Sequence, residues 1–181
     1  MLTGKLIGNT IYLRSLTALD VNDQYLHWLN DPQVNQYLET RFSVQSLKSI
    51  GDFVHQMNES KYDWLMAICD KHNDTHVGNI KLGPLNTIHL CADISLFIGD
   101  KTYWGRGIAT EAIRLIAGFA FEQLNLHKVK AGCYVTNLGS YHAFKKAGFT
   151  LEGTLRNQYR SGDGYVDCYL LGLLEHEWNR I

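Results

Sequence analysis

The chain has 181 residues, of which 45% are hydrophobic and 19% are charged, and its formal net charge at pH 7 is −1. This composition suits one globular domain spanning residues 1–181, and the near-zero charge argues against nucleic acid or an anionic membrane as a partner. No run approaches the roughly 18 apolar residues of a membrane span, and the first residues lack the apolar stretch of a signal peptide, so we expect a cytoplasmic protein.

The beginning of the chain predicts a strand followed by a helix. Ile11–Leu16 is the predicted strand. Thr17 and Asp20 then have the spacing of a capping box, with Asp in place of Glu, so we expect a helix from there to about Asn30. The pair Asp31-Pro32 stops it, because the residue before a proline is biased away from helical angles.

Two further helices are predicted before the middle of the chain. A short one covers about Gln33–Leu38. Ser43 is the expected cap of the next, since Ser satisfies the free N–H groups at a helix start. Its apolar residues recur at helical spacing and are Val44, Leu47, Ile50, Phe53, Val54 and Met57.

Three strands are predicted in the middle of the chain. Tyr62–Asp70 and His76–Leu82 are joined by a polar turn at residues 71–75. Ile88–Ile98 follows as the third member of an antiparallel meander.

A glycine pair marks the turn from this meander into a helix. Gly105 and Gly107 are followed by apolar residues at helical spacing, which predicts a helix to about Leu124. Glycine accepts backbone angles and close approaches that other residues do not, and a helix start carries unpaired N–H groups with a partial positive charge. The turn therefore predicts a cradle for a phosphate or pyrophosphate.

Two other phosphate-binding motifs fit this stretch poorly. A dinucleotide-binding fingerprint needs a third glycine where Thr110 stands, and it opens a βαβ unit rather than following a meander. A P-loop needs Gly-Lys-Ser/Thr after its first glycine, and that run does not occur here.

The remaining segments predict helix-crossed strands. They are a strand at Val129–Val135, a helix at Leu138–Ala147 ended by Gly148, and strands at Phe149–Arg160 and Tyr165–Leu173 around the hairpin turn 161–164. The predicted fold class is therefore a mixed α/β (α+β) single domain: helices first, an antiparallel meander, then strands connected by helices.

The four cysteines lie far apart, without a Cys-x-x-Cys pair. All of them fall in strand-like segments: Cys69, Cys91, Cys133 and Cys168. We expect reduced, mostly buried thiols rather than disulfides or a metal site.

Several segments stand in order along nearly the whole chain, namely Trp104–Ala112 with the strand before it, Asn137–Ser140 and Phe144–Phe149. Together they resemble the GCN5-related N-acetyltransferase (GNAT) superfamily. Further segments resemble the subgroup of ribosomal-protein-alanine N-acetyltransferases (RimJ/RimL-type), namely Leu13–Leu16, Trp28–Val34 and Leu151–Gly153. Such a fold has a mostly antiparallel central sheet with a splayed strand pair and flanking helices.

The resemblance implies acetyl-CoA as co-substrate and no metal. The pyrophosphate would lie on the amides of the glycine loop, and the pantetheine arm would run along Leu96–Ile98 in a V-shaped split from Val129–Val135. Asn137 would touch that arm, and Lys146 would approach the nucleotide end. The implied cofactor-binding residues are Leu96, Phe97, Ile98, Gly105, Arg106, Gly107, Ile108, Ala109, Thr110, Asn137, Ser140, Phe144 and Lys146.

The sequence departs from the family pattern at two positions. The family loop usually opens with Gln or Arg three residues before its first glycine, where this chain has Thr102. Many relatives use a Tyr to protonate the leaving thiolate, and its place is taken by Phe144, which has no proton to give. Ser140 lies one helical turn earlier, and related enzymes with an Asn-x-x-Ser pattern point to it as the catalytic hydroxyl. The alternative is a helix-start hydroxyl that bonds its own backbone.

Acetyl transfer also needs a neutral amine and a donor for the oxyanion. Asp93 stands where family members often carry an acidic residue that accepts a proton, and the alternative is a solvated strand carboxylate. Glu152 is a second candidate base. The oxyanion donor would be a backbone N–H near Leu96 or Phe97.

The resemblance implies an N-acetyltransferase in which a primary amine attacks the acetyl group directly. Its expected acceptor is a protein N-terminus or a small amine such as a nucleotide-linked amino sugar, and the acceptor-site candidates are Tyr25, Tyr37, Glu39 and Arg41. The alternative is an acyl-CoA-binding sensor or partner protein without turnover, which the loss of the usual Tyr allows. Dimers are common in the family, so a homodimer stays open.

Overall fold

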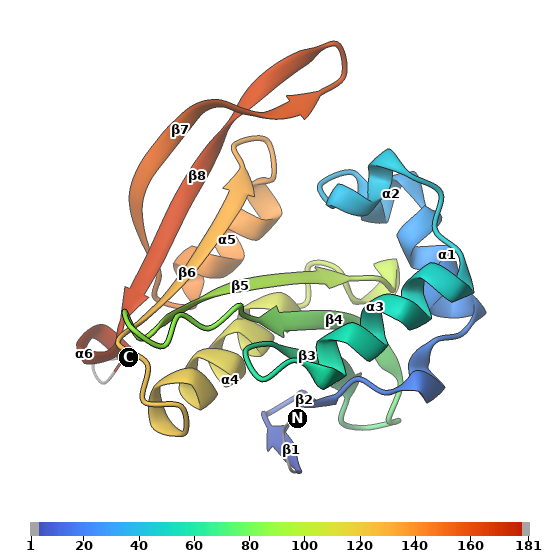
Figure 1. The fold of residues 1–181 in the computed structure, drawn as a ribbon, viewed down its shortest axis with the longest axis horizontal. Coiled ribbons are helices and arrows are strands. Elements are labelled where there is room, and N and C mark those ends of the chain that lie inside the picture. Colours follow the sequence, from blue (N-terminus) through green and yellow to red (C-terminus); the bar gives the residue numbers. More distant parts are fainter. Residues whose placement is uncertain (1–3, 179–181) are drawn as a thin grey trace.

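The computed structural model describes residues 4–178, so the ends of the predicted domain, residues 1–3 and 179–181, lie outside the described part. An eight-stranded sheet has the order β1-β2-β3-β4-β5-β6-β8-β7 (Figure 1). Every neighbouring pair is antiparallel except β5 and β6. This mostly antiparallel α/β sheet confirms the predicted fold class.

Most predicted elements are present with small shifts of their ends. The strands are β1 (Lys5–Ile7), β2 (Ile11–Ser15), β3 (Trp64–Asp70), β4 (His76–Leu82), β5 (Cys91–Ile98), β6 (Lys128–Tyr134), β7 (Thr150–Ser161) and β8 (Gly164–Leu174). The α-helices are α1 (Asp23–Asn30), α2 (Pro32–Asn35), α3 (Leu47–Glu59), α4 (Ile108–Glu122), α5 (Leu138–Lys146) and α6 (Glu175–Trp178). The 3-10 helices are η1 (Ala18–Asp20), η2 (Glu39–Phe42) and η3 (Lys101–Tyr103).

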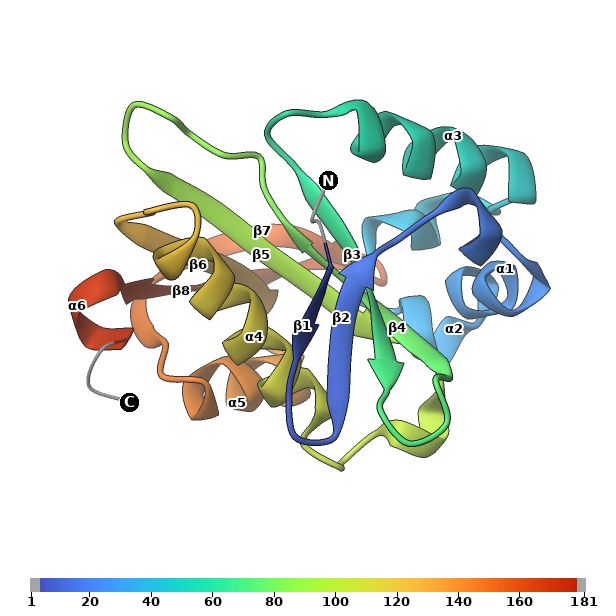
Figure 2. The same cartoon turned by 90° about the horizontal axis from the view of Figure 1, so that it is seen from below.

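Helices cover both faces of the sheet (Figure 2). One hydrophobic core joins the sheet to α4 and α5, and a second joins it to α1, α2 and α3. Strand β3 serves both: Met66 and Ile68 belong to the first core, whereas Ala67 and Cys69 belong to the second. This period of two is the alternation of side chains along a strand that is buried on both faces.

The central strands β5 and β6 part after a short paired stretch. They are parallel partners only over Cys91–Asp93 and Lys128–Lys130. Beyond these residues β5 pairs with β4 alone and β6 pairs with β8 alone, so the two strands diverge as a V (Figure 1). The expected splayed pair is therefore present. The edge of β5 that faces the V keeps backbone N–H and C=O groups without a strand partner in the described part of the chain.

The single helix predicted from Thr17 to Asn30 is wrong, because the chain forms two helices there. Thr17 and Asp20 do make a capping box, but it closes only the 3-10 helix η1. Val21 then leaves helical angles, and α1 starts anew with Asn22 as its cap, accepting from the Tyr25 N–H at 3.1 Å.

Two other predicted starts are displaced. Helix α3 is capped by Ser46 rather than Ser43, because the Ser46 hydroxyl accepts from the Ser49 N–H at 3.1 Å. Strand β5 begins at Cys91 rather than Ile88, because Leu90 has φ +49° and cannot continue an extended strand. The short elements β1 and α6 carried no pattern strong enough to predict.

Asp20 does more than cap η1, because it also receives the Arg14 guanidinium through two bonds of 2.7 and 2.8 Å. Burial alone would raise the pKa of Asp20, but the bonds from Arg14 and Thr17 lower it below its ordinary value. A carboxyl with a depressed pKa stabilises the fold above its unfolded pKa, and this contribution is lost as the pH falls through the folded one.

Asp20→Asn is therefore expected to lower the free energy of unfolding by about 2 kcal/mol at pH 7, because it leaves Arg14 half-buried without its charge partner. The deficit should shrink as the pH falls below about 4, where the carboxyl of the unfolded chain becomes protonated, and should vanish once the pH has also fallen through the lowered pKa of the folded carboxyl. Urea unfolding at pH 7 and pH 3 measures both values. Asp52→Asn is the control, since the Lys48–Asp52 pair is exposed to solvent and its loss should leave the free energy of unfolding almost unchanged. Equal losses in the two variants would contradict the role given to Asp20.

Candidate active site

The glycine loop leaves the start of α4 open. Gly105 has φ +73°, and Gly107, the residue that caps α4, has φ +81°. A Cβ built on either glycine would meet no atom within 4 Å, and no side chain among the described residues caps this helix. The N–H groups of the first turn are therefore available to an anion, which the helix dipole also favours. The backbone has the form that a phosphate cradle requires.

Side chains next to the loop tie it to the ends of two strands. The Trp104 indole N–H donates to the carbonyl of Ile98, the last residue of β5, at 2.8 Å. The Tyr103 hydroxyl donates to Asp70, the last residue of β3, at 2.8 Å. The loop is thus held against the sheet before any ligand arrives.

Thr102 occupies the place where the family usually has Gln or Arg. Its N–H and hydroxyl both donate to Asp100, at 2.9 and 2.7 Å, and so shape the turn into η3. The cation at this loop is instead Arg106, whose guanidinium lies 5.2 Å from the centre of the Tyr103 ring and whose residue is exposed.

Helix α5 is fastened to α4 beside the loop. Asn137 caps α5 by accepting the Ser140 N–H at 3.1 Å. The Thr110 hydroxyl donates to a carbonyl of α5 at 3.5 Å, and Arg114 donates to the Lys146 carbonyl at 2.7 Å. Helices α4 and α5 therefore lie side by side, with Asn137 and Ser140 at the start of α5 and Lys146 at its end.

Two of the implied cofactor-binding side chains are buried in the main core. Ile108 is 6% exposed and Phe144 is 2% exposed. Phe144 packs edge-on against Phe149, with ring centres 5.0 Å apart. Ile108 can therefore offer only its backbone to a ligand, and the Phe144 ring does not lie on an accessible surface. Ala109 lies half-buried in the first turn of α4.

Ser140 points toward β6. Burial raises the pKa of the Cys133 thiol to about 11, and the neighbouring Ser140 side chain acts against that rise. The Ser140 side chain therefore lies close to Cys133 of β6. It lies where α5 meets β6, one arm of the V.

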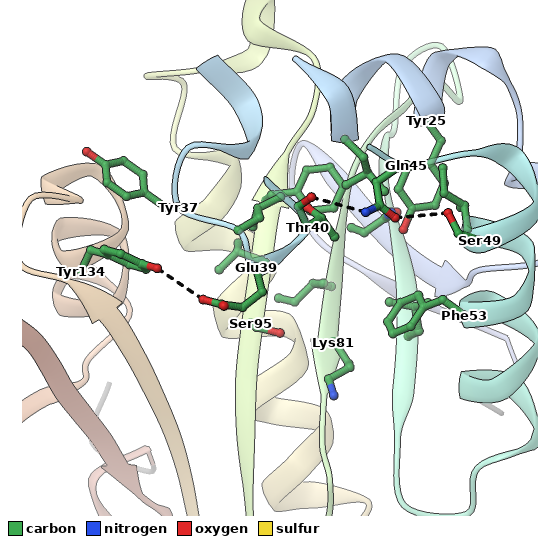
Figure 3. Close-up of a pocket in the computed structure, with 18 of the residues that line it drawn as sticks. Tyr25, Tyr37, Glu39, Thr40, Gln45, Ser49, Phe53, Lys81, Ser95 and Tyr134 are labelled. Carbon is green, nitrogen blue, oxygen red and sulfur yellow. Dashed lines mark hydrogen bonds between the residues drawn. The ribbon is translucent and has the colours of Figure 1, made fainter. Parts of the chain in front are cut away.

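A cavity of about 460 Å³ opens between the helices α1 and α3 and the strands of the V (Figure 3). This volume is in the range of small-molecule sites. Strand β5 contributes Ser95, Leu96 and Phe97. Much of the remaining wall is apolar and includes Leu29, Leu38, Ile50, Phe53, Leu65 and Ile80.

Three of the four acceptor-site candidates line this cavity, namely Tyr25, Tyr37 and Glu39. The Tyr37 hydroxyl donates to the Thr136 carbonyl, just past the end of β6, at 3.1 Å. The segment that carries Tyr37 and Glu39 therefore reaches from the helical side of the molecule to β6 and walls the cavity.

Arg41, the fourth candidate, does not line the cavity but supports this wall. One nitrogen of its guanidinium donates to the Tyr134 hydroxyl of β6 at 2.9 Å and to the Arg160 carbonyl of β7 at 2.6 Å. The same side chain donates to the Gln36 carbonyl through its other nitrogen. Its three partners come from separate parts of the chain, so Arg41 positions the wall rather than facing a bound molecule.

The cavity carries little charge. Glu39 and Lys81 are its charged residues among the described lining, and Lys81 is already paired with Asp63 at 3.2 Å. Glu39 accepts from the Tyr134 hydroxyl at 3.3 Å (Figure 3). Tyr134 stacks on Tyr159 with ring centres 4.3 Å apart. A cation entering the cavity would meet a single carboxylate, held at the side of the V.

Asp93 and Glu152, the two candidate bases, do not line the cavity. Asp93 lies 3.2 Å from Lys130, and Glu152 receives Lys128 at 2.5 and 2.7 Å. Asp93, Lys128 and Lys130 belong to the stretch where β5 and β6 are still hydrogen-bonded. Both carboxylates therefore neutralise lysines near the closed end of the V, whereas Glu39 faces its open part.

Several residues of the cavity were missed by the sequence reasoning. Asn79, Ser95, Tyr134 and Tyr159 come from four different strands. The alternation of side chains along β5 did place Ser95 on the same face as Phe97. The residues of neighbouring strands that share this face can be identified only once the β4–β5 register is known.

The described residues hold no cluster of three or more His, Cys, Asp or Glu side chains that could bind a metal ion. None of the helices within residues 4–178 is both long and apolar enough to cross a bilayer. All four cysteines are free thiols, and three of them are buried.

Comparison with known proteins gives concordant matches. The Acetyltransferase (GNAT) domain family profile matches residues 10–150. A Bacillus subtilis protein named "Probable N-acetyltransferase YjcK" is 31% identical over 178 residues, covering 92% of this chain and 95% of that protein. The spermidine N(1)-acetyltransferase of Escherichia coli K12 is 26% identical over 175 residues, covering 94% of this chain and 89% of the enzyme.

Solved structures share the fold over most of their length. A GNAT-family acetyltransferase from Bacillus anthracis superposes with a TM-score of 0.82 at 21% identity, covering 96% of this chain and 99% of that one. A Vibrio cholerae spermidine N-acetyltransferase in complex with CoA and spermine gives a TM-score of 0.76 at 21% identity, covering 94% and 98%. At this level of identity the superpositions establish the architecture.

Proposed function

This chain belongs to the GNAT acetyltransferase family, and we propose that it moves an acetyl group from acetyl-CoA to a primary amine by direct attack. The observation that carries the proposal is the uncapped, glycine-led start of α4. Its loop is bonded through Trp104 to Ile98 at the end of β5, one arm of the split between β5 and β6. A cavity large enough for a small acceptor opens on that same split.

The residues around α4 fit acetyl-CoA. A Cβ at Gly105 or Gly107 would project into open space, which is where a pyrophosphate would lie on the loop amides. Arg106 supplies a positive charge beside it, and the exposed Lys146 lies at the end of the neighbouring helix. The unpaired edge of β5 offers backbone groups to an extended pantetheine arm, as an added strand would use them. Acetyl-CoA supplies the activated acetyl group.

The residues of the cavity then have separable roles. Glu39 would receive the acceptor ammonium and, through water, take its proton before attack, because it is the carboxylate that faces the cavity. A backbone N–H of Leu96 or Phe97 would stabilise the oxyanion. As the amine nitrogen bonds to the acetyl carbon, the carbon–sulfur bond breaks and Ser140 would donate a proton to the departing thiolate. The proton that the bonded nitrogen then loses would return through water to Ser140. Asp93 and Glu152, each paired with a lysine near the closed end of the V, stay the predicted alternatives to Glu39 as the base.

The acceptor is proposed to be a protein N-terminus or a nucleotide-linked amino sugar. Enzymes named for ribosomal-protein alanine have N-termini as substrates, and the segments Leu13–Leu16 and Trp28–Val34 resemble that subgroup. Curated relatives also include spermidine enzymes. A cavity with one carboxylate and one paired ammonium suits an acceptor of low charge better than a polyamine.

Release of free CoA thiol from acetyl-CoA in parallel acceptor pools tests the proposal. One pool holds peptides with free Ala, Ser or Met N-termini, and the other holds nucleotide-linked amino sugars. Thiol release in either pool supports amine acetylation and names the acceptor. Bound acetyl-CoA without release for these or other primary amines would instead favour an acyl-CoA sensor, which the replacement of the family Tyr by Phe144 permits.

Ser140→Ala is expected to lower kcat by about tenfold or more, because the thiolate then leaves without its proton donor. The Kd for acetyl-CoA should stay within about twofold, since Asn137 still caps α5 through the backbone N–H of residue 140. Tyr141→Phe is the matched control: it also removes one hydroxyl, but Tyr141 packs against Tyr169 with ring centres 5.0 Å apart. Steady-state kinetics with titration calorimetry measure both effects. A kcat unchanged by Ser140→Ala would remove Ser140 from the mechanism.

A further inference from the structure

Asn79 of β4 is a buried amide with an unused hydrogen-bond donor. The residue is 2% exposed and lines the cavity, and its Nδ2 has no hydrogen-bond partner among the described residues. A buried donor without a partner destabilises the fold, because its bond to water is lost without replacement. Groups of this kind are rare in folded proteins and call for an explanation such as a missing ligand.

The orientation of this amide is fixed by His76. Nε2 of His76 lies 2.7 Å from the Asn79 Oδ1 and 3.0 Å from the Gly78 carbonyl oxygen. A carbonyl oxygen only accepts, so Nε2 must carry the hydrogen that both oxygens share. Burial lowers the pKa of His76, so the ring is neutral at pH 7. Oδ1 is therefore occupied, and the NH₂ group is the end of the amide left for the cavity.

Tyr25 does not satisfy this donor. Burial raises the pKa of Tyr25 to about 12, and the neighbouring Asn79 side chain acts in the opposite direction. The two groups are thus close, but their geometry does not meet that of a hydrogen bond, and Nδ2 stays unpaired. The hydroxyl of Thr40, also on the cavity wall, is the second buried polar side-chain atom without a partner in the described part of the chain.

The unpaired donors of Asn79 and Thr40, together with the low charge of the cavity, restrict the molecules that can bind there. Resting on the proposed function, we propose that the acceptor carries one amine with a hydrogen-bond-accepting oxygen close to it, such as an amide carbonyl, and that Asn79 Nδ2 binds this oxygen. The ammonium lies toward Glu39, and the apolar wall that includes Phe53 and Ile50 takes the rest of the molecule. A polyamine at neutral pH offers donors only, so it leaves Asn79 unpaired and brings additional positive charge past Lys81.

A matched pair of amines tests the proposal: phenylalanine amide, which has the carbonyl, and phenethylamine, which lacks it. The wild type should prefer phenylalanine amide over phenethylamine by about tenfold or more in kcat/KM. The Asn79→Leu variant should have a higher KM for phenylalanine amide, and its preference for that amine should be about tenfold smaller. The amide group also makes the amine less basic, but this difference cancels when the two proteins are compared. Titration calorimetry of both amines into the CoA complex gives the same ratio for binding.

Two further measurements separate recognition from stability. Asn79→Leu removes the unpaired Nδ2 together with the Oδ1 that accepts from His76, but His76 Nε2 keeps the Gly78 carbonyl at 3.0 Å, so its Tm should fall less than that of Asn58→Leu. Asn58→Leu breaks a hydrogen bond of 3.1 Å to the Leu16 carbonyl outside the cavity and should lower Tm while keeping the amine preference. An unchanged preference in Asn79→Leu, or spermidine as the better wild-type substrate, would overturn the inference. If no amine were acetylated, the proposed function would fail, and the calorimetric ratio would still decide the role of Asn79.

Discussion

An aspartate at Gly105 or Gly107 is expected to raise the Kd for acetyl-CoA by about 100-fold or more, which corresponds to roughly 3 kcal/mol. Each variant places a negative charge on the surface where the pyrophosphate would lie, at the helix start whose free N–H groups favour an anion. The carboxylate can also accept these N–H groups itself and so occupy the site. Titration calorimetry with acetyl-CoA measures the loss.

Two controls separate charge from backbone strain. Gly162→Asp puts the same side chain at φ +57° in open space, but in the β7–β8 turn, so it should carry a similar strain and leave the Kd within about twofold. Gly105→Ala carries the strain at the loop without the charge and should weaken binding by about tenfold or less. If Gly105→Asp and Gly107→Asp bound acetyl-CoA as the wild type does, the cofactor would lie elsewhere.

The glycine loop could be predicted from the sequence because its evidence is local. Two glycines one residue apart and the apolar spacing after them determine a turn and a helix whatever the rest of the chain does. The same holds for the end of α1 at Asp31-Pro32 and for β4, whose predicted bounds His76–Leu82 are those observed. Such features depend on backbone angles and on one face of one element.

The helix starts were harder to place because several residues compete for the same role. Thr17, Asn22, Ser43 and Ser46 are all good caps, and the choice depends on where the chain must turn to pack. Asp20 shows the competition directly, since Arg14 from β2 takes part of its hydrogen-bonding capacity. A tertiary partner of this kind leaves no trace in the local pattern.

The cavity could be predicted only in part. Tyr25, Tyr37 and Glu39 were reached through a family resemblance, whereas Asn79 and Tyr134 needed the register of the sheet. The candidate bases show the limit most clearly. The alternation of side chains along β5 predicted correctly on which face of the sheet Asp93 lies, but not how far along the V it lies. Asp93 belongs to the stretch where β5 still pairs with β6, and this position separates it from the cavity. The role of Ser140 stays a prediction, as do the roles of Asp93 and Glu152.

The sheet next to the cavity needs a glycine at position 78, because the backbone of the neighbouring strand leaves no room for a Cβ. Gly78 of β4 lies opposite Ile98 of β5, and a Cβ there would come within 2.3 Å of the Phe97 carbonyl oxygen and 2.9 Å of the Ile98 Cα. Both are backbone atoms of the neighbouring strand, so neither can turn aside as a side chain would. Gly78→Ala must push β4 and β5 apart where Asn79 and Phe97 meet the cavity.

Gly78→Ala is therefore expected to lower the free energy of unfolding by about 3 kcal/mol, and the Tm by roughly 6–12 °C.

Gly172→Ala of β8 is the matched comparison. Its Cβ would meet the Glu152 carboxylate at 2.5 Å, close to the 2.3 Å at Gly78, but this contact is with the mobile end of a half-exposed side chain. Glu152 can swing away at the cost of its bond to Lys128, so the loss should be about 1 kcal/mol or less. Urea unfolding of the two variants compares them directly. Equal losses would mean that β4 and β5 separate easily, and a pair that loose could not hold the Asn79 amide in the fixed orientation that acceptor recognition requires.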